Sequence, residues 1–193
     1  TGLEELAIIQ AAVNVGTKES DGVDYKLHYN WNPSFGVWDF NVVGTHQLTS
    51  DSSLTGSDLG RFGNNDNVVF KDKWLFSTAL TTGNWTNVIS WDYKSSYDDQ
   101  EQEVEITGQG FPLGAGPTTD VMLKVPSYSL WNYQVRWNTL EDKLGLTFGV
   151  NNLLDEEPPL TLRTSGAGHQ VGWDPRYTDA YGRTYYLRAD YSF

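Results

Sequence analysis

The residues best suited to chemistry lie close together in the segment 166–181. This segment contains Trp173, Arg176, Tyr177 and Tyr181. Aromatic rings can stack on a sugar, and an arginine can grip a carboxylate or a catecholate through parallel hydrogen bonds. We therefore treat the segment as a candidate substrate-binding loop. The alternative is that these residues only shape the loop, and this is the simpler interpretation.

No other set of residue types has the spacing of a catalytic or metal-binding site. His28, His46 and His169 fall in separate segments and form neither a His-x-x-x-His nor a His-Glu-x-x-His motif. An acidic run at 98–105 lacks the Asp-x-Asp-x-Asp-Gly spacing of a calcium loop, so it is better explained as a solvated loop. The chain has no Gly-x-Ser-x-Gly motif and no cysteine. We therefore expect no enzymatic activity, no metal site and no cofactor.

The chain is acidic and rich in aromatic residues. Its net charge of −12 disfavours nucleic acid as a partner, because binding nucleic acid requires a basic surface. Aromatic residues make up 14% of the 193 residues. No run of about 18 apolar residues is present to form a transmembrane helix, but a transmembrane β-strand needs only about 9–11 alternating residues. The composition therefore allows either a soluble protein or a membrane β-barrel.

The candidate residues must be positioned by strands, because apolar and polar residues alternate along much of the chain. The segment 23–31 shows this most clearly, since Val23 and Tyr25 alternate with Asp24 and Lys26. Successive side chains of a strand point to opposite faces, so each such segment has one apolar face and one polar face. About eight segments follow this pattern, at 6–15, 23–31, 38–48, 74–81, 85–94, 131–138, 144–151 and 184–193.

The connections between these segments alternate in length. Long polar loops are expected at 49–72, 98–125 and 155–183. Tight turns are expected at 32–34, 82–84 and 140–142, and a further short turn at 18–22 departs from the alternation. Short periplasmic turns and long extracellular loops are typical of outer-membrane barrels. The pattern predicts an all-β, antiparallel transmembrane β-barrel with its carboxy terminus on the periplasmic side.

The polar faces of these strands are expected to line the lumen of the barrel. Charged neighbours of both signs predict cross-strand pairs along a wet wall, which a plug or a passing ligand would contact. For each residue taken singly, a solvated wall position is the simpler interpretation. The predicted wall residues are Asp24, Lys26, His28, Asp39, Asn41, Asp92, Lys94, Asn132, Gln134, Arg136, Arg188 and Asp190.

Two other architectures fit the alternation. A soluble carbohydrate-binding β-sandwich would turn the same apolar faces into a core, but its strands are typically only about five or six residues long. A self-contained small outer-membrane barrel of about eight strands, with a structural or adhesive role, is the other alternative. Aromatic residues near the strand ends favour a membrane barrel over the sandwich, because such residues form girdles at the membrane interfaces.

Two stretches resemble a known family. In the first, a strand at 144–151 runs into an Asn-Asn-Leu-Leu-Asp motif and two prolines, and in the second a Gly-Arg pair leads into an aromatic-rich final strand. Together they resemble the closing strands of TonB-dependent outer-membrane receptors, and the Gly-Val-Asp at 22–24 resembles an earlier strand start. Leu154 stands where the family typically has phenylalanine. The residues that carry the resemblance are Asn151, Asn152, Leu153, Asp155, Pro158, Pro159, Gly182, Arg183, Leu187, Tyr191 and Phe193.

The resemblance implies a barrel of about 22 strands with a plug in its lumen. Residues 1–193 would be the carboxy-terminal part of that barrel without a separate second domain, and the plug and the earlier strands would be missing. Expected partners are the plug and the remaining strands, the TonB complex, outer-membrane lipid and the barrel assembly machinery. The implied function is import of a scarce nutrient across the Gram-negative outer membrane: a ferric siderophore, a corrinoid or an oligosaccharide. Leu187, Tyr191 and Phe193 are expected to serve assembly.

Overall fold

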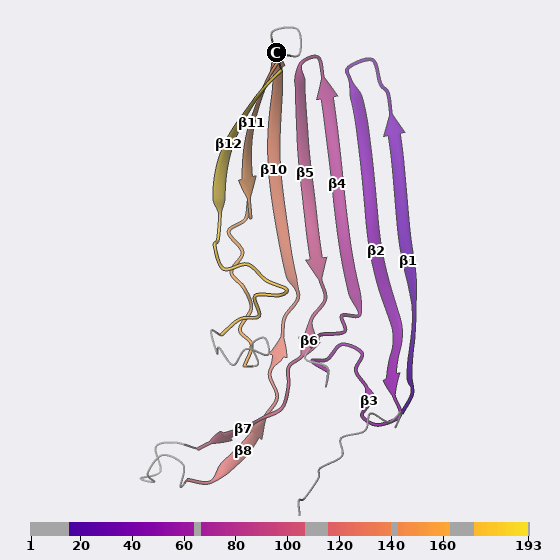
Figure 1. The fold of residues 1–193 in the computed structure, drawn as a ribbon, viewed down its shortest axis with the longest axis vertical. Helices are drawn as coiled ribbons and strands as arrows, with labels where there is room; N and C mark the ends of the chain where they lie inside the picture. The colour runs from indigo at the N-terminus through magenta and orange to yellow at the C-terminus, as the bar shows by residue number, and fades with distance from the viewer. Residues whose placement is uncertain (1–15, 64–66, 107–115, 140–142, 163–171, 193) are drawn as a thin grey trace, which may run out of the picture.

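Seven long strands form one antiparallel sheet in the computed structural model, which describes residues 16–63, 67–106, 116–139, 143–162 and 172–192 (Figure 1). Each strand pairs with its neighbours in chain order, and the short β3 (Gly56–Ser57) pairs with β2. The described residues contain no helix, and so none that could span a membrane. The long strands are β1 (Lys18–Trp31), β2 (Val37–Ser52), β4 (Asp72–Thr82), β5 (Trp85–Lys94), β10 (Tyr128–Thr139), β11 (Leu144–Asn151) and β12 (Thr184–Tyr191).

The all-β antiparallel prediction is therefore confirmed, with two qualifications at the start of the chain. The segment 6–15 lies outside the described residues. The short turn expected at 18–22 is wrong, because these residues belong to β1 and pair with β2, with a register shift between Asp21 and Gly22. A bulge of this kind interrupts strict alternation, so the sequence there does not look like a strand.

The pairing register collects the alternating residues into two continuous faces. For example, Phe76 on β4 lies opposite Val42 on β2 and Trp91 on β5, and Trp91 lies opposite Trp131 on β10. The apolar face comprises Val23, Tyr25, Leu27, Tyr29, Trp31, Trp38, Phe40, Val42, Trp74, Phe76, Leu80, Trp85, Ile89, Trp91, Tyr93, Trp131, Tyr133, Val135, Trp137, Leu144, Leu146, Phe148, Val150, Tyr185, Leu187, Ala189 and Tyr191. The alternate residues of the same strands form the polar face.

Aromatic side chains on the apolar face form two bands. One band lies near the tight turns, where Trp31 stacks on Trp38 and Trp85 stacks on Trp137, with ring centroids 6.3 and 5.8 Å apart. The second band lies six residues further along the strands and includes the stacked pairs Tyr25–Trp74 and Trp91–Trp131. Six residues span about 20 Å along a strand. Two girdles at roughly this spacing are the pattern of a lipid-facing barrel surface.

Three polar side chains on the apolar face form hydrogen bonds with, or beside, aromatic residues. The Tyr133 hydroxyl donates to Asn87 Oδ1 at 2.7 Å, and Trp91 Nε1 donates to Ser129 Oγ at 2.6 Å. Trp38 Nε1 donates to Thr78 Oγ1, which in turn donates to the backbone carbonyl of Asp39. A hydrocarbon environment requires such internal pairing, because no water is present to bond an open polar group.

The tight turns and the long connections lie at opposite ends of the sheet (Figure 1). Gly83, in the two-residue turn between β4 and β5, has a φ of +56°, a conformation that glycine adopts without strain. The turn that joins β1 to β2 lies at the same end, as does the end of β12 (Figure 1). The long connections add two short hairpins at the other end, β6 (Tyr97–Asp98) with β9 (Lys124–Val125) and β7 (Gln102–Glu105) with β8 (Thr118–Val121).

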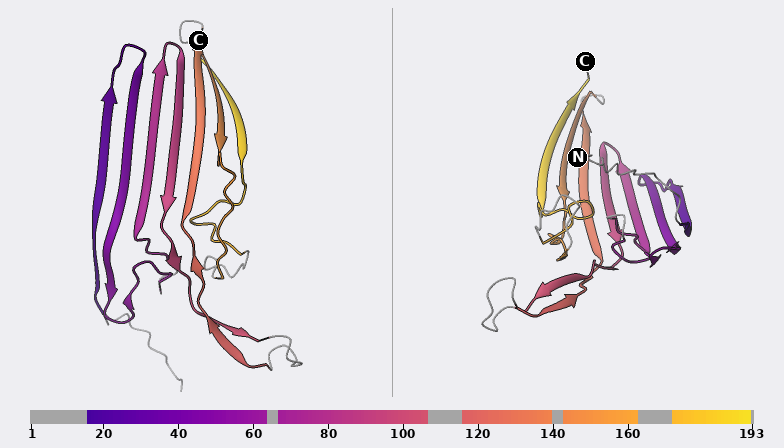
Figure 2. Two further views of the ribbon diagram at one scale, coloured as in Figure 1. Left: turned by 180° about the vertical axis from the view of Figure 1, so that it is seen from behind. Right: turned by 60° about the horizontal axis from the view of Figure 1, so that its bottom comes forward.

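The sheet is a single curved layer, and the β7–β8 hairpin extends away from it (Figure 2). The apolar face is not covered by a second layer: Leu27 is 59% exposed and Leu187 is 77% exposed. A sandwich would bury these residues, so the described residues do not form one. Within them the sheet also stays open, because β1 and β12 each pair on one side only. The first strand of the self-contained small barrel, expected at 6–15, lies outside the described residues, so that alternative stays a prediction.

Candidate functional site

The polar face carries a network of side-chain hydrogen bonds on β1 and β2. His28 Nδ1 lies 2.7 Å from Asn41 Oδ1, and His28 Nε2 lies 3.0 Å from Asn30 Nδ2 and 3.6 Å from Asp39 Oδ2. Asn41 Nδ2 donates to Asp39 Oδ1. His28 is therefore held by amide and carboxylate neighbours, as expected for a wall residue. No group of three or more potential metal ligands occurs in the described part of the chain.

A second network crosses three strands near the tight turns. Arg136 on β10 reaches over β11 to Asp190 on β12, with a separation of 3.0 Å between Nη1 and Oδ2. The path is open because β11 has a glycine, Gly145, where a Cβ would overlap the Arg136 guanidinium. Arg188 Nη2 also binds Asp190 Oδ1, at 2.8 Å. Two arginines thus share one carboxylate, which leaves this group with a net positive charge.

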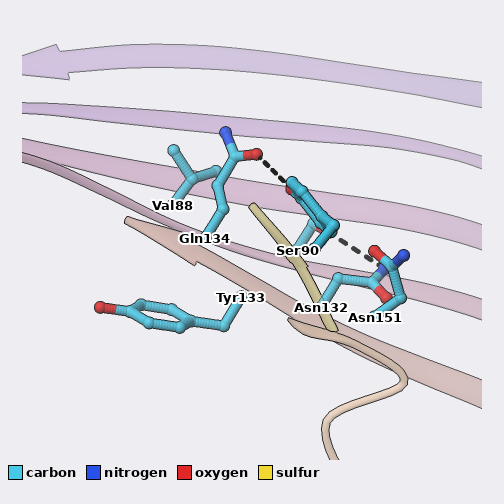
Figure 3. Close-up of a pocket in the computed structure, with 7 residues that line it drawn as sticks. Val88, Ser90, Asn132, Tyr133, Gln134 and Asn151 are labelled. Carbon is cyan, nitrogen blue, oxygen red and sulfur yellow. Dashed lines mark hydrogen bonds between the residues drawn. The ribbon is translucent and has the colours of Figure 1, made fainter. Parts of the chain in front are cut away.

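Between the charged groups lies an uncharged hollow of about 280 Å³ (Figure 3). The ring of Tyr186 lies over Gly149, where any Cβ would overlap it, and its hydroxyl donates to Gln134 Oε1 at 2.8 Å. Asn132 Oδ1 accepts from the backbone N–H of Asn152 at 2.9 Å, and its Nδ2 lies 3.5 Å from Ser90 Oγ. Glycine thus lets an aromatic ring lie flat among amides.

The long-loop end of the polar face is more charged. Lys94 donates to Asp92 on the same strand at 3.0 Å, and the Thr45 hydroxyl donates to Asp24 at 2.7 Å. Lys73 on β4 lies directly opposite Lys94 on β5. Like charges in opposite positions repel, and the carboxylate of Asp92 offsets part of that repulsion.

The register places every predicted wall residue on the polar face. The expected cross-strand charge pairs form only in part, because Lys94–Asp92 and Arg188–Asp190 run along single strands and Arg136–Asp190 spans an intermediate strand. That this face lines a lumen stays a prediction. The predicted wall residues are those of β1 (Asp24, Lys26, His28), β2 (Asp39, Asn41), β5 (Asp92, Lys94), β10 (Asn132, Gln134, Arg136) and β12 (Arg188, Asp190).

The long connections meet in a small hydrophobic cluster, which we call the loop cap. Phe70 lies edge-on to Tyr97 and to Tyr177, with ring centroids 5.6 and 5.0 Å apart. The Tyr177 hydroxyl accepts from the backbone N–H of Val68 at 3.0 Å. Residues from all three long connections contribute to the cap: Phe62, Val68, Phe70, Tyr97, Val125 and Tyr177.

Two buried carboxylates bind the cap together. Asp99 Oδ2 accepts from the Thr161 hydroxyl at 2.8 Å and from the backbone N–H of Leu162 at 2.6 Å. Asp174, only 1% exposed, accepts from Arg176 Nη2 at 2.6 Å. Burial, with the nearby charges of Asp99 and Asp174 as smaller causes, raises the pKa of Tyr97 above its ordinary value. The three long connections therefore form one packed unit at this end of the sheet.

The four candidate substrate-binding residues fall into two groups. Tyr177 belongs to the loop cap. Arg176 lies against the cap, with its guanidinium 5.4 Å from the ring centroid of Phe62 and 5.1 Å from that of Tyr177. Their contacts account for a loop-shaping role. Trp173 is half-buried, and Tyr181 is 86% exposed, so the structure does not bring the four into one pocket. A role in substrate binding stays a prediction for each.

The family motif after β11 forms a turn that joins three strands. Asn152 has a φ of +52°, and its side chain bonds both backbone polar groups of Glu156 at 2.8 Å. Leu153 donates its N–H to the carbonyl of Trp131 on β10 at 2.6 Å. Asp155 Oδ1 accepts from the N–H of Arg183 just before β12, at 2.7 Å.

The other motif residues lie as follows. Asn151 ends β11, and Gly182 has a φ of +66°. Leu187 and Tyr191 point outward from β12 on the apolar face. Pro158 and Pro159 are half-buried, and Phe193 lies outside the described residues.

Sequence reasoning missed three of the residues that organise these sites. Asp99 and Asp174 were expected only as parts of loops, and Tyr186 only as one residue of the strand at 184–193. A sequence signal exists for Asp174, since Asp followed by proline typically opens a turn in which its side chain binds the backbone two residues on. Arg176 N does donate to Asp174 Oδ1, at 3.0 Å. Nothing local marks Asp99, whose partners Thr161 and Leu162 are about sixty residues away.

The comparison with known families gives one match. The family model described as "TonB dependent receptor-like, beta-barrel" matches residues 4–153. No curated protein and no solved structure matches the chain.

Proposed function

Because the chain belongs to the TonB-dependent receptor β-barrel family, we propose that it forms the carboxy-terminal part of the wall of an active-transport receptor. The family is one of outer-membrane transporters. The complete receptor binds a scarce nutrient at the cell surface and imports it with energy delivered by TonB through the plug. It carries out no covalent chemistry. The nutrient is a siderophore, a corrinoid or an oligosaccharide.

The observation that carries this proposal is the division of the sheet into two faces. Seven strands turn a continuous, exposed apolar face with two aromatic bands to one side and a hydrogen-bonded polar face to the other. A wall that separates lipid from a wet lumen requires this division. The polar face thus lines the lumen and contacts the plug or a passing ligand.

The position of the long connections supports an extracellular loop cap. All three lie at one end of the sheet, and the tight turns lie at the other (Figure 1). Outer-membrane barrels place long loops outside and short turns in the periplasm. Leu187 and Tyr191 of β12, together with Phe193, serve recognition by the barrel assembly machinery.

The proposal is tested by uptake in a Gram-negative host that carries the full-length receptor. Cells with and without a functional TonB complex are given a ferric siderophore, a corrinoid or an oligosaccharide, each radiolabelled. We expect one ligand class to bind in both strains and to accumulate only in the strain with TonB. Equal accumulation in the two strains would contradict TonB-dependent transport, and binding of no class would contradict a receptor role for these nutrients.

A further inference from the structure

The hollow on the polar face is lined without any charged residue, although charged groups lie on both sides of it. Its lining includes Ser90, Asn132, Gln134, Asn151 and Tyr186. These side chains supply hydroxyl and amide groups that both donate and accept hydrogen bonds. Figure 3 shows Gln134, Ser90, Asn132 and Asn151 on one side of β10, while Tyr133 points to the other side.

Beside the hollow, two arginines share a single carboxylate. Arg136 and Arg188 both bind Asp190, and no described residue of the hollow takes part in these ion pairs. The lining itself carries no charge, so a charged ligand in the hollow would lose hydration without an opposite charge in the lining to pair with. The hollow is therefore suited to a neutral ligand.

Tyr186 supplies an aromatic platform within the hollow. Its ring lies against Gly149 on one side and remains 37% exposed. The bond from its hydroxyl to Gln134 Oε1 fixes the position of both groups, and no described residue accepts from Gln134 Nε2. The platform thus has a fixed ring beside an amide donor that is open to the lumen side.

Two further polar groups are held in place around this platform. The N–H of Asn152 anchors Asn132 Oδ1, so Asn132 Nδ2 is directed towards Ser90 at the long distance of 3.5 Å. Asn151 is exposed, and its Nδ2 makes only a 3.3 Å contact with Thr184 Oγ1. These groups are positioned before any ligand arrives, which lowers the entropic cost of binding.

We propose that this hollow binds a unit of a neutral, polyhydroxylated ligand, so that the substrate class of the receptor is an uncharged oligosaccharide. The apolar C–H face of a sugar ring fits against Tyr186, and its hydroxyls both donate to and accept from the surrounding amides. The volume of about 280 Å³ lies just below the usual range of ligand pockets, which begins near 300 Å³, and so suits part of a longer chain. This inference rests on the proposed function.

The test is calorimetric binding to the purified full-length receptor. The probes are neutral gluco-, xylo- and galacto-oligosaccharides, compared with a ferric tris-catecholate and a ferric hydroxamate. The variants are Tyr186→Leu, which removes the ring, Tyr186→Phe, which removes only the hydroxyl, and Gln134→Leu. Asn84→Ala, an amide truncation in the tight turn between β4 and β5, is the matched control. Resistance to unfolding in detergent confirms that each variant is folded.

We expect an oligosaccharide to bind, Tyr186→Leu and Gln134→Leu to weaken its binding at least tenfold, Tyr186→Phe to weaken it less, and Asn84→Ala to leave it unchanged. Binding of an iron chelate but no oligosaccharide would overturn the inference and leave TonB-dependent transport intact. Unchanged affinity in folded Tyr186→Leu and Gln134→Leu receptors would also overturn it. Should Tyr186→Leu not fold, Tyr186→Phe and Gln134→Leu decide the result.

Discussion

At the scale of single residues, three polar side chains on the apolar face form hydrogen bonds with tyrosine or tryptophan. Asn87 is an amide surrounded by tryptophan, isoleucine and valine positions, and its Oδ1 accepts from the Tyr133 hydroxyl on the neighbouring strand. Ser129 and Thr78 have corresponding partners in Trp91 and Trp38. Tyrosine and tryptophan can do this because each combines an apolar ring with a polar group. The pairing is required if this face contacts lipid rather than water.

Breaking one of these pairs should therefore destabilise the receptor. We expect Tyr133→Phe to lower the free energy of unfolding by about 1–3 kcal/mol, because Asn87 loses its partner in an environment without water. The measurement is urea unfolding of the full-length receptor in lipid vesicles. The double variant Tyr133→Phe/Asn87→Leu removes both polar groups and should recover most of the loss. A double variant that is less stable than Tyr133→Phe would show that Asn87 contacts water.

At the scale of elements, a glycine in one strand lets a large side chain from a neighbouring strand lie over it. On the polar face, Gly145 and Gly149 of β11 make room for Arg136 and Tyr186. On the apolar face, the indole of Trp74 from β4 lies over Gly44 of β2 and stacks on Tyr25 of β1, with ring centroids 5.4 Å apart. One aromatic ring thereby connects three strands.

A side chain at position 44 should disrupt this contact. In Gly44→Ala the new Cβ overlaps the Trp74 ring, so we expect a loss of about 1–3 kcal/mol in the free energy of unfolding, typical of overpacking. When Trp74 has already been replaced by alanine, the ring that the Cβ of Gly44→Ala would overlap is absent. A double-mutant cycle with Trp74→Ala should therefore show a much smaller effect of Gly44→Ala. Equal effects in both backgrounds would mean that the ring does not lie over Gly44.

The strands themselves could be predicted from the sequence because alternation reports a local property of the chain. The segment 131–138 alternates clearly and lies within β10, and Gly83 and Asn84 of the turn expected at 82–84 lie between β4 and β5. The start of β1 could not be predicted, since the register shift at Asp21 and Gly22 breaks the alternation. Local signals fail wherever a strand is irregular.

The candidate sites were less accessible to sequence reasoning, because their contacts join distant parts of the chain. The loop cap brings Phe62 and Tyr177 into one cluster although more than a hundred residues separate them. The hollow depends on Gly149 giving room to Tyr186, which only the strand register reveals. Alternation assigned Gln134 to the polar face, but it contains no information about which neighbour Gln134 binds.

At the scale of the whole molecule, the two ends of the sheet should lie on opposite sides of the outer membrane. These 193 residues contain no cysteine. A single cysteine introduced here therefore reports its own position once any cysteines elsewhere in the receptor have been replaced. We expect Leu54→Cys, in a long connection, to react with a membrane-impermeant maleimide in intact cells. Asn84→Cys, in the tight turn after β4, should react only once the outer membrane is permeabilised. The reverse labelling pattern would place the loop cap in the periplasm.

The central claim is that one face of the sheet contacts lipid and the other lines a wet lumen. Spin labels attached one at a time to positions 75–80 of β4, in the full-length receptor in lipid vesicles, test it most directly. Residues 76, 78 and 80 lie on the apolar face, and residues 75, 77 and 79 lie on the polar face. We predict that oxygen, which concentrates in lipid, relaxes each even-numbered label more strongly than the odd-numbered labels next to it. Accessibility to oxygen that does not alternate along β4, or that is higher at the odd-numbered positions, would contradict the claim.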